Sequence, residues 1–342
     1  MSVSPDIAQG ELQCPDCGGQ RRYAPDAGAL TCDSCGSVHP IPRDPAIDAT
    51  DDFAHDPAAP DAPHPPTDLI HGCATCGGEV IFPGQSLAQR CPYCDGPAVV
   101  TTGAAEYGTM ALIPFEQVED TGWHNARAWI AGRHAAPADL PQALESGKLV
   151  GLYAPFFTFD CKEFVRYTGR YKSGKHHRTK RGNLRLAFDD LLAPASPHIT
   201  PLIRDGVLHD FDPSKLRPYH PGYIAGFAAE RHHMSVADGL TANEADKAVL
   251  IKNRIQQATA ERLSNIRFET DTTGIRYRRI LLPVWIVHYT YKGTPYKVVA
   301  CGLHGTTFGE RPFSTAKLFG YAATLSAMAI GVGIAWGALG LP

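Results

Sequence analysis

The chain has 342 residues, of which 44% are hydrophobic and 20% are charged, and its formal net charge is −3. This length predicts two or three domains, and this apolar share can bury a core, which argues against a disordered chain. The small negative charge argues against a protein coated by nucleic acid throughout, although a local basic patch could still bind polyanions.

Eight of the ten cysteines form four Cys-x-x-Cys pairs in two sets with the same spacing. Two cysteines separated by two residues can direct both sulfurs at one ion from a tight turn. Two such turns complete a tetrahedral shell of four thiolates, the environment that zinc prefers. We therefore expect two zinc ions, one held by Cys14, Cys17, Cys32 and Cys35 and one by Cys73, Cys76, Cys91 and Cys94.

Disulfides and unbound thiols are the alternatives to metal at these cysteines. The first eleven residues have neither a basic start nor an apolar core, so we expect no secretory signal and a reducing compartment, where disulfides are rare. Iron in an all-sulfur site has the same ligands, and the spacing does not separate the two metals. A closed shell of four cysteines leaves no position for water or substrate. The metals are therefore expected to hold the fold together and to do no chemistry.

A glycine follows each pair and is expected to supply the positive φ of the turn. It comes directly after the first three pairs (Gly18, Gly36, Gly77) and one residue later after the fourth (Gly96). The two remaining cysteines, Cys161 and Cys301, lie in apolar runs and are expected to be small core residues.

In chain order, residues 1–42 are expected to form the first zinc ribbon and 70–102 the second. Between them, 43–69 is rich in Asp, Pro and Ala and has Arg43 as its only Lys or Arg residue, which predicts a solvated, disordered linker that lets the ribbons move independently. The second ribbon is the more apolar one, so we expect it to pack on the domain C-terminal to it.

Residues 103–312 are expected to form a β-rich α+β domain. Apolar segments around Pro155 and Pro283 each precede a Tyr-x-Gly turn, at Gly169 and Gly293, which predicts two related antiparallel hairpins in one sheet. Helical spacing of apolar residues predicts helices over 116–133 and 242–263. The whole chain is therefore expected to be α+β, with two four-cysteine ribbons and a mainly antiparallel β domain.

The C-terminal segment 313–342 is expected to be a membrane anchor. Residues 318–341 carry no charge, and as a helix they can cross a hydrocarbon core about 30 Å thick. Arg311 and Lys317 precede the segment, which predicts a single pass through the inner (cytoplasmic) membrane with the N-terminal domains in the cytoplasm. A small-residue helix buried in a soluble core is the alternative.

A basic segment, 170–185, contains seven Lys or Arg residues and two His. Beside a membrane anchor it could contact anionic lipid head groups, and without one it could contact nucleic acid. A solvated hairpin tip explains the same composition.

Together, the two ribbons, the segments around Pro155 and Pro283, and the apolar C-terminal helix resemble a bacterial family of zinc-ribbon membrane proteins. Its members are often labelled transcription-factor-IIB-type zinc ribbon proteins, or primosomal protein N′ (replication factor Y) helicases. The resemblance implies a membrane protein that recruits phage-shock protein A-like partners in envelope stress, with the eight cysteines as metal ligands.

The helicase label can be tested on the residues. A helicase motor needs a Gly-rich loop ending in Gly-Lys-Ser/Thr, but Leu149 follows Gly147-Lys148 and His176 follows Gly174-Lys175. We therefore expect no motor and no enzyme, and predict a non-catalytic adaptor that recruits cytoplasmic proteins to the membrane. The alternatives are a nucleic-acid-binding ribbon protein and an iron redox protein.

Overall fold

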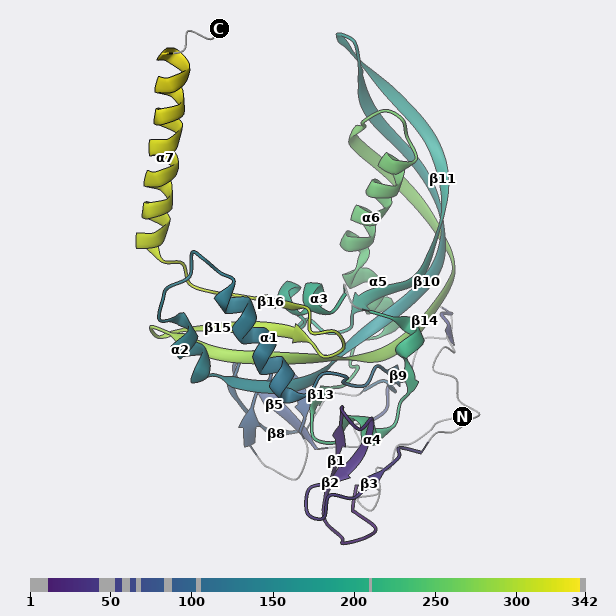
Figure 1. Ribbon diagram of the computed structural model, residues 1–342. Coiled ribbons are helices and arrows are strands. Elements are labelled where there is room, and N and C mark those ends of the chain that lie inside the picture. The colour runs from purple at the N-terminus through teal and green to yellow at the C-terminus, as the bar shows by residue number, and fades with distance from the viewer. Residues whose placement is uncertain are drawn as a thin grey trace.

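Two very long antiparallel strands, β10 (Lys148–Ser173) and β14 (Ser264–Tyr291), run through the molecule (Figure 1). The computed structural model describes residues 12–42, 53–56, 62–65, 69–82, 88–102, 106–208 and 211–338. The inner halves of both strands, 151–159 and 278–287, are buried on both faces. In their outer halves, buried or half-buried residues alternate with exposed ones. The pair is therefore the core of a central body at one end and part of a projecting arm at the other.

A thirteen-stranded sheet is built around this pair within the described residues. Its main path runs β12-β9-β14-β10-β13-β6-β5-β8-β7, and β11, β15, β16 and β4 attach to its sides. Among the strand pairs of the described residues, only β10–β13 and β14–β9 are parallel. The strand bounds are β4 Phe53–Ala54, β5 Ile70–Cys73, β6 Glu79–Ile81, β7 Ala88–Arg90, β8 Pro97–Thr101, β9 Ala111–Leu112, β11 His176–Pro194, β12 Arg217–Pro218, β13 Ala228–Glu230, β15 Thr294–Cys301 and β16 Thr307–Gly309. The α+β class and the mainly antiparallel sheet are confirmed.

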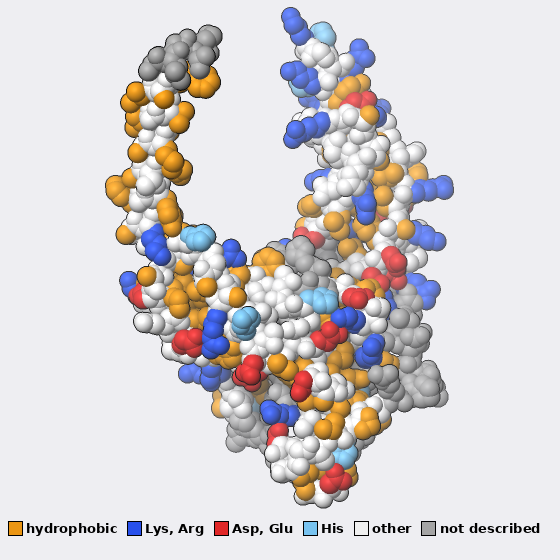
Figure 2. Space-filling view, in the orientation of Figure 1, with side chains coloured by type: hydrophobic (Ala, Val, Ile, Leu, Met, Phe, Trp, Pro, Cys, Tyr) orange, Lys and Arg blue, Asp and Glu red, His pale blue; other side chains and the backbone are white. Residues whose placement is uncertain are grey.

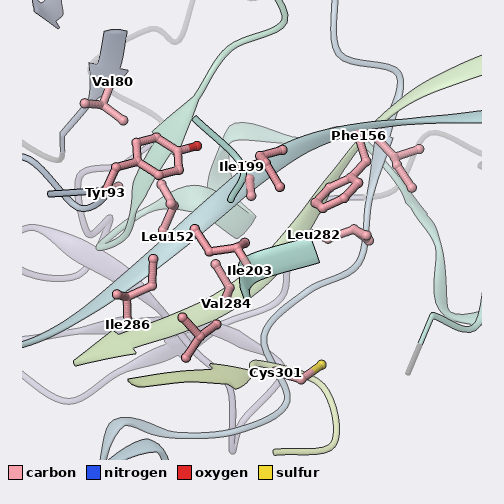
Figure 3. Packing of buried hydrophobic residues seen from close by; sticks show 14 of the residues in the cluster. Val80, Tyr93, Leu152, Phe156, Ile199, Ile203, Leu282, Val284, Ile286 and Cys301 are labelled. Carbon is pink, nitrogen blue, oxygen red and sulfur yellow. The ribbon is translucent and has the colours of Figure 1, made fainter. Parts of the chain in front are cut away.

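The core lies on both faces of the inner halves. On one face, Ile203 of α3 (Pro201–Leu208) packs with Leu152, Val284 and Ile286, and Val80 and Tyr93 of the second cysteine segment belong to the same cluster (Figure 3). On the other face Phe115, Tyr153 and Trp285 form an aromatic cluster with Phe227. Farther along the sheet, α1 (Glu119–Ala131) and α2 (Leu140–Glu145) cover Val287 and Tyr289.

The arm consists of β10, β11 and β14, with α6 (Glu244–Gln257) against one face. Val165 and Tyr167 of β10 pack on Ile251 and Ile255 of α6, together with Leu263. The short α5 (Val236–Ala242) precedes α6. The opposite face of the strands carries polar side chains, because successive residues of a strand point to opposite faces.

Several expected boundaries differ from the structure. The hairpin turn at Lys292–Gly293 is confirmed, and both residues have positive φ. The turn expected at Gly169 is wrong: β10 continues to Ser173 and turns at Gly174 (φ 61°). Gly169 instead lies in the strand, where a Cβ would come within 3.0 Å of Leu263. The helices expected over 116–133 and 242–263 are shorter, as α1 and α6.

Parts of the expected linker 43–69 lie against the body. Phe53–Ala54 pairs with Arg276 and Tyr277 of β14, and His64 forms an isolated bridge with Glu106. These residues are mostly exposed, as expected of a solvated linker, but their pairing differs from the disorder expected over 53–56 and 62–65. Residues 43–52, 57–61 and 66–68 lie outside the described ranges.

The remaining elements are a small separate sheet and the C-terminal helix. The sheet consists of β1 (Arg21–Ala24), β2 (Ala29–Cys32) and β3 (Val38–His39). Next to it lies α4 (Pro221–Ile224), which comes after the 3₁₀ turn Pro213–Lys215. The last helix, α7 (Thr315–Ala338), projects from the body on the same side as the arm (Figure 1).

Candidate metal centres

The first cysteine set is brought together by two tight turns at the end of the β1–β3 sheet. In each turn the N–H of a glycine donates to the carbonyl of the first cysteine, Gly18 to Cys14 at 2.8 Å and Gly36 to Cys32 at 2.9 Å. Both glycines have φ near +75°, as expected. Across the two turns, the Cys14 and Cys35 sulfurs are 3.7 Å apart and those of Cys17 and Cys32 are 3.5 Å apart.

The second set repeats this geometry, with one turn between β5 and β6 and the other between β7 and β8. The Cys73 and Cys94 sulfurs are 3.5 Å apart, and those of Cys76 and Cys91 are 3.7 Å apart. The expectation for Gly96 is wrong, because Asp95 takes the positive φ (58°) and donates to the Cys91 carbonyl. Gly96 has a different role: a Cβ there would lie 2.3 Å from Thr75 Oγ1 in the opposing turn. It lets the two turns approach each other.

Both clusters fit a tetrahedral ion. Sulfurs bound to zinc at about 2.3 Å are about 3.8 Å from one another, close to the separations seen here. The sulfurs of each set all lie within 4.8 Å of one another. All ten cysteines are free, and a disulfide would bring two sulfurs to about 2.05 Å. The eight predicted ligands are therefore assembled as two four-cysteine groups that could hold zinc ions.

The surroundings of the sulfurs favour thiolates at some positions. The Ser37 hydroxyl, with smaller help from backbone N–H groups, lowers the pKa of Cys14 to about 5. At Cys73 burial raises the pKa, but the N–H groups of Cys76 and Thr75 outweigh it and bring the pKa to about 7. Burial raises the pKa of Cys94 to about 11. A cation at the centre would displace the remaining protons.

The two clusters differ in how they are attached. In the first, Cys17 and Cys35 are exposed, and the segment meets the body where Tyr23 N–H donates to the Ala225 carbonyl at 2.9 Å and the Tyr23 ring packs on Tyr223. In the second, no ligand is exposed, and β6 pairs with β13 of the main sheet. The expected packing of the second segment on the domain is confirmed. The first segment is also docked, in contrast to the expected independent movement.

A buried polar network joins the second cluster to the body. Tyr93, between Cys91 and Cys94, donates its hydroxyl proton to Glu230 of β13, and Ser196 donates to the same carboxylate at 2.8 Å. On the same turn, His288 Nε2 donates to the Pro92 carbonyl at 2.7 Å. Burial raises the pKa of Glu230 to about 8. Sequence reasoning missed Glu230, because nothing in the residues around position 230 signals a partner 137 positions away.

A second missed group lies beside the first cluster. His39 Nε2 is 3.9 Å from Cys14 Sγ, 3.1 Å from an Asp16 carboxylate oxygen and 3.1 Å from Ser37 Oγ. Cys14, Asp16 and His39 thus form a third group with metal-ligand atoms close together, sharing Cys14 with the cluster. The expected ligand set omitted Asp16 and His39, because it was based on the Cys-x-x-Cys spacing alone.

The two other expected functional features lie on one side of the body (Figure 2). Among the described residues, α7 is the one helix whose length and composition suffice to cross a membrane, with mean hydropathy 1.7 over Thr315–Trp336 and none of its apolar window buried. The basic segment 170–185 is an ordered hairpin. Arg170, Lys172 and Arg181 are exposed on the face that α6 does not cover, since Arg170 pairs with Thr179 and Thr168 pairs with Arg181. Cys161 and Cys301 are buried, as expected.

Fold and site together define an α+β protein with two four-cysteine centres and one exposed apolar helix. No protein-family model matches the sequence, and no solved structure matches it. The chain is similar to the uncharacterized protein YdjG of Bacillus subtilis (strain 168), with 23% identity over 322 residues, covering 90% of this chain and 91% of YdjG. The similarity therefore extends over nearly the whole of both chains.

Proposed function

We propose that this protein is a non-catalytic, membrane-anchored adaptor whose two cysteine centres hold zinc. The observation that carries the proposal is α7, a helix of 24 residues that exposes Leu325, Ile330, Val332 and Ile334 to its surroundings. Apolar surface on this scale is costly in water and favourable in a bilayer. Lys317 at its start favours a cytoplasmic position for the upstream body.

Zinc in this account is structural. Four thiolates close each shell, which leaves no coordination position for a substrate, so the ions stabilise the turns. The first cysteine segment is small. Apart from its cysteines, the buried apolar residues described in it are Tyr23, Ala29, Leu30 and Ile41, so metal ligation would supply much of its folding free energy. The first ribbon is then a rigid, exposed surface suited to binding a partner protein.

The proposed partners are cytoplasmic proteins of the envelope-stress type, phage-shock protein A-like, as the resemblance to zinc-ribbon membrane proteins implies. The first ribbon is the better candidate for their contact surface, because the second is built into the sheet and its Tyr93 turn is held by the body.

Affinity purification from detergent-solubilised membranes tests this assignment. Full-length wild type is compared with Cys14→Ser/Cys17→Ser and with Cys73→Ser/Cys76→Ser. We expect the protein in the membrane fraction and loss of partners in the first variant, while its body remains folded. Recovery in the soluble fraction would overturn the membrane proposal, and retention of every partner by the first variant would exclude the first ribbon as the contact surface.

A second candidate function is nucleic-acid binding, and the basic face of the arm favours it. No Asp or Glu occurs between Arg170 and Arg185, and Arg267 of β14 lies opposite Thr168 on the same face. Such a face attracts phosphates. Aromatic side chains for base stacking are nearly absent from it, which favours the adaptor over a single-strand binder. Co-purification of the full-length protein with nucleic acid from a soluble fraction would favour this second function.

A further inference from the structure

An open groove of about 760 Å³ lies beside the base of α7. It is formed by the end of α1, the start of α3, strands β15 and β16, and the link Glu310–Phe313 that leads into α7. Hydrophobic side chains gather on the surface below the base of this helix, with cationic side chains near them (Figure 2). The metal centres do not contribute to this groove.

Aromatic side chains form much of its wall. Trp129 lies directly on Gly309 of β16, where a Cβ would come within 2.7 Å of the indole, so glycine permits this contact. Tyr296 and Phe308 also line the groove, and Phe313 is 59% exposed. Tryptophan and tyrosine are the side chains that membrane proteins place at the head-group level.

Two guanidinium groups are held on these rings. Arg133 lies over Trp129 and Arg311 lies over Phe313, each 4.5 Å from the ring centroid. Neither forms an ion pair with any described residue, and Nη1 of Arg311 is buried without a hydrogen-bond partner. Both guanidinium side chains line the groove without an anionic partner among the described residues, so the site is suited to a ligand that supplies an anionic oxygen. Glu310 also lines the groove, which leaves one carboxylate against two guanidiniums.

The groove is fixed relative to the start of α7. Ser314 N–H donates to the Ala135 carbonyl at 2.9 Å, Lys317 Nζ to the Ala136 carbonyl at 2.8 Å and the Tyr321 hydroxyl to the His134 carbonyl at 3.2 Å. The first two turns of α7 are therefore tied to the chain just after Arg133. If α7 enters a bilayer, the groove lies at the level of the lipid head groups.

We propose that this groove binds one anionic phospholipid, with its phosphate and acidic head group between Arg133 and Arg311 and its upper acyl chain against Trp129 and Phe313. The inference rests on the proposed insertion of α7 in a membrane. Charge complementarity favours an anionic over a zwitterionic lipid, because the zwitterion would bring an ammonium group next to the two guanidiniums.

Tryptophan quenching by brominated lipids tests the proposal on the full-length protein in nanodiscs. Brominated phosphatidylserine and brominated phosphatidylcholine are titrated in separate series over the same range of mole fractions. The Trp129 signal is the difference between wild type and Trp129→Phe, and the Trp336 signal is the difference between wild type and Trp336→Phe. Trp336 lies in α7 and reports insertion, whereas Trp129 reports the groove.

We expect half-quenching of Trp129 at a mole fraction of brominated phosphatidylserine that is about fivefold lower than that of brominated phosphatidylcholine. About one contact between a cationic side chain and an anionic head group would give a preference of this size. Arg133→Gln, at an exposed position, and Arg311→Gln should each reduce this preference, and Glu310→Gln should increase it. Arg127→Gln is the matched control: Arg127 also stacks on a tryptophan of α1 but is ion-paired with Glu145 outside the groove.

Equal quenching of Trp129 by both lipids would mean a groove without head-group selectivity, and no quenching would mean another occupant; either result overturns the proposal while leaving α7 in the membrane. An unquenched Trp336 would overturn the membrane insertion itself, and the lipid site with it.

Discussion

The hydroxyl of Tyr93, one residue before the last cysteine of the second centre, donates a hydrogen bond to the buried carboxyl group of Glu230 on β13. This contact joins a Cys-x-x-Cys turn to the central sheet across 137 positions of sequence. Glu230 is fully buried, and its other oxygen accepts from Ser196. The second centre is therefore positioned by the body as well as by its own ligands.

Replacing Tyr93 by Phe should destabilise the protein by about 1–3 kcal/mol, because a buried carboxyl group loses one of its two donors. Unfolding by denaturant of the zinc-loaded protein in detergent measures this loss. The Glu230→Gln variant provides a double-mutant cycle. Additive losses in the cycle would show that the two side chains do not interact.

Stability should depend on pH through Glu230. Burial raises the pKa of Glu230 to about 8, above its ordinary value of 4.5, so the native state binds this proton more tightly than the unfolded state. Its contribution to stability is full below about pH 4.5 and is lost as the pH rises toward 8. Glu230→Gln, which cannot ionise, should therefore gain stability relative to wild type between pH 5 and pH 8. A difference between the two proteins that stays constant over this range would contradict the buried, protonated carboxyl.

The first centre should lose its metal faster than the second. Cys17 and Cys35 are exposed, whereas every ligand of the second centre is buried or half-buried and its turn is held by Tyr93 and His288. Release followed with a chromophoric chelator should show two phases differing several-fold in rate. Cys17→Ser should remove the fast phase alone, and Cys94→Ser the slow phase alone. A single phase in the wild type would mean that attachment to the body does not protect the second centre.

The basic face of the arm should account for whatever polyanion binding the chain shows. Replacing Arg170, Lys172 and Arg181 together by Gln should lower the salt concentration at which the full-length protein elutes from heparin, since each lost phosphate-like contact removes about one released counterion. The matched control replaces Lys148, Lys162 and Lys292, which are also exposed but lie off this segment. Equal shifts in both variants would show that net charge, rather than the arm, controls binding.

The features that sequence predicted well are local. Two residues between cysteines determine the turns, so the eight ligands and three of the four positive-φ positions can be read from spacing. The fourth positive-φ position was predicted wrongly. Asp95 adopts the positive φ that was expected of Gly96, although aspartate tolerates this conformation less well than glycine. The Lys292–Gly293 hairpin is likewise a two-residue signal.

Features that depend on distant residues could not be read in the same way. Strands β10 and β14 have 26 and 28 residues, far more than an ordinary strand. The residues that pair between them are more than 90 positions apart in the sequence. Gly169 looked like a turn residue, but Leu263 packs over it in the arm. The docking of the second cysteine segment depends on β13, whose residues Ala228–Glu230 carry no motif.

The most direct test of the account is the metal content of the full-length protein purified from membranes without added metal. We predict two zinc ions per chain, falling to one in Cys14→Ser/Cys17→Ser and to one in Cys73→Ser/Cys76→Ser. Iron in place of zinc, or a wild type that contains no bound metal while all eight cysteines are reduced, would contradict it.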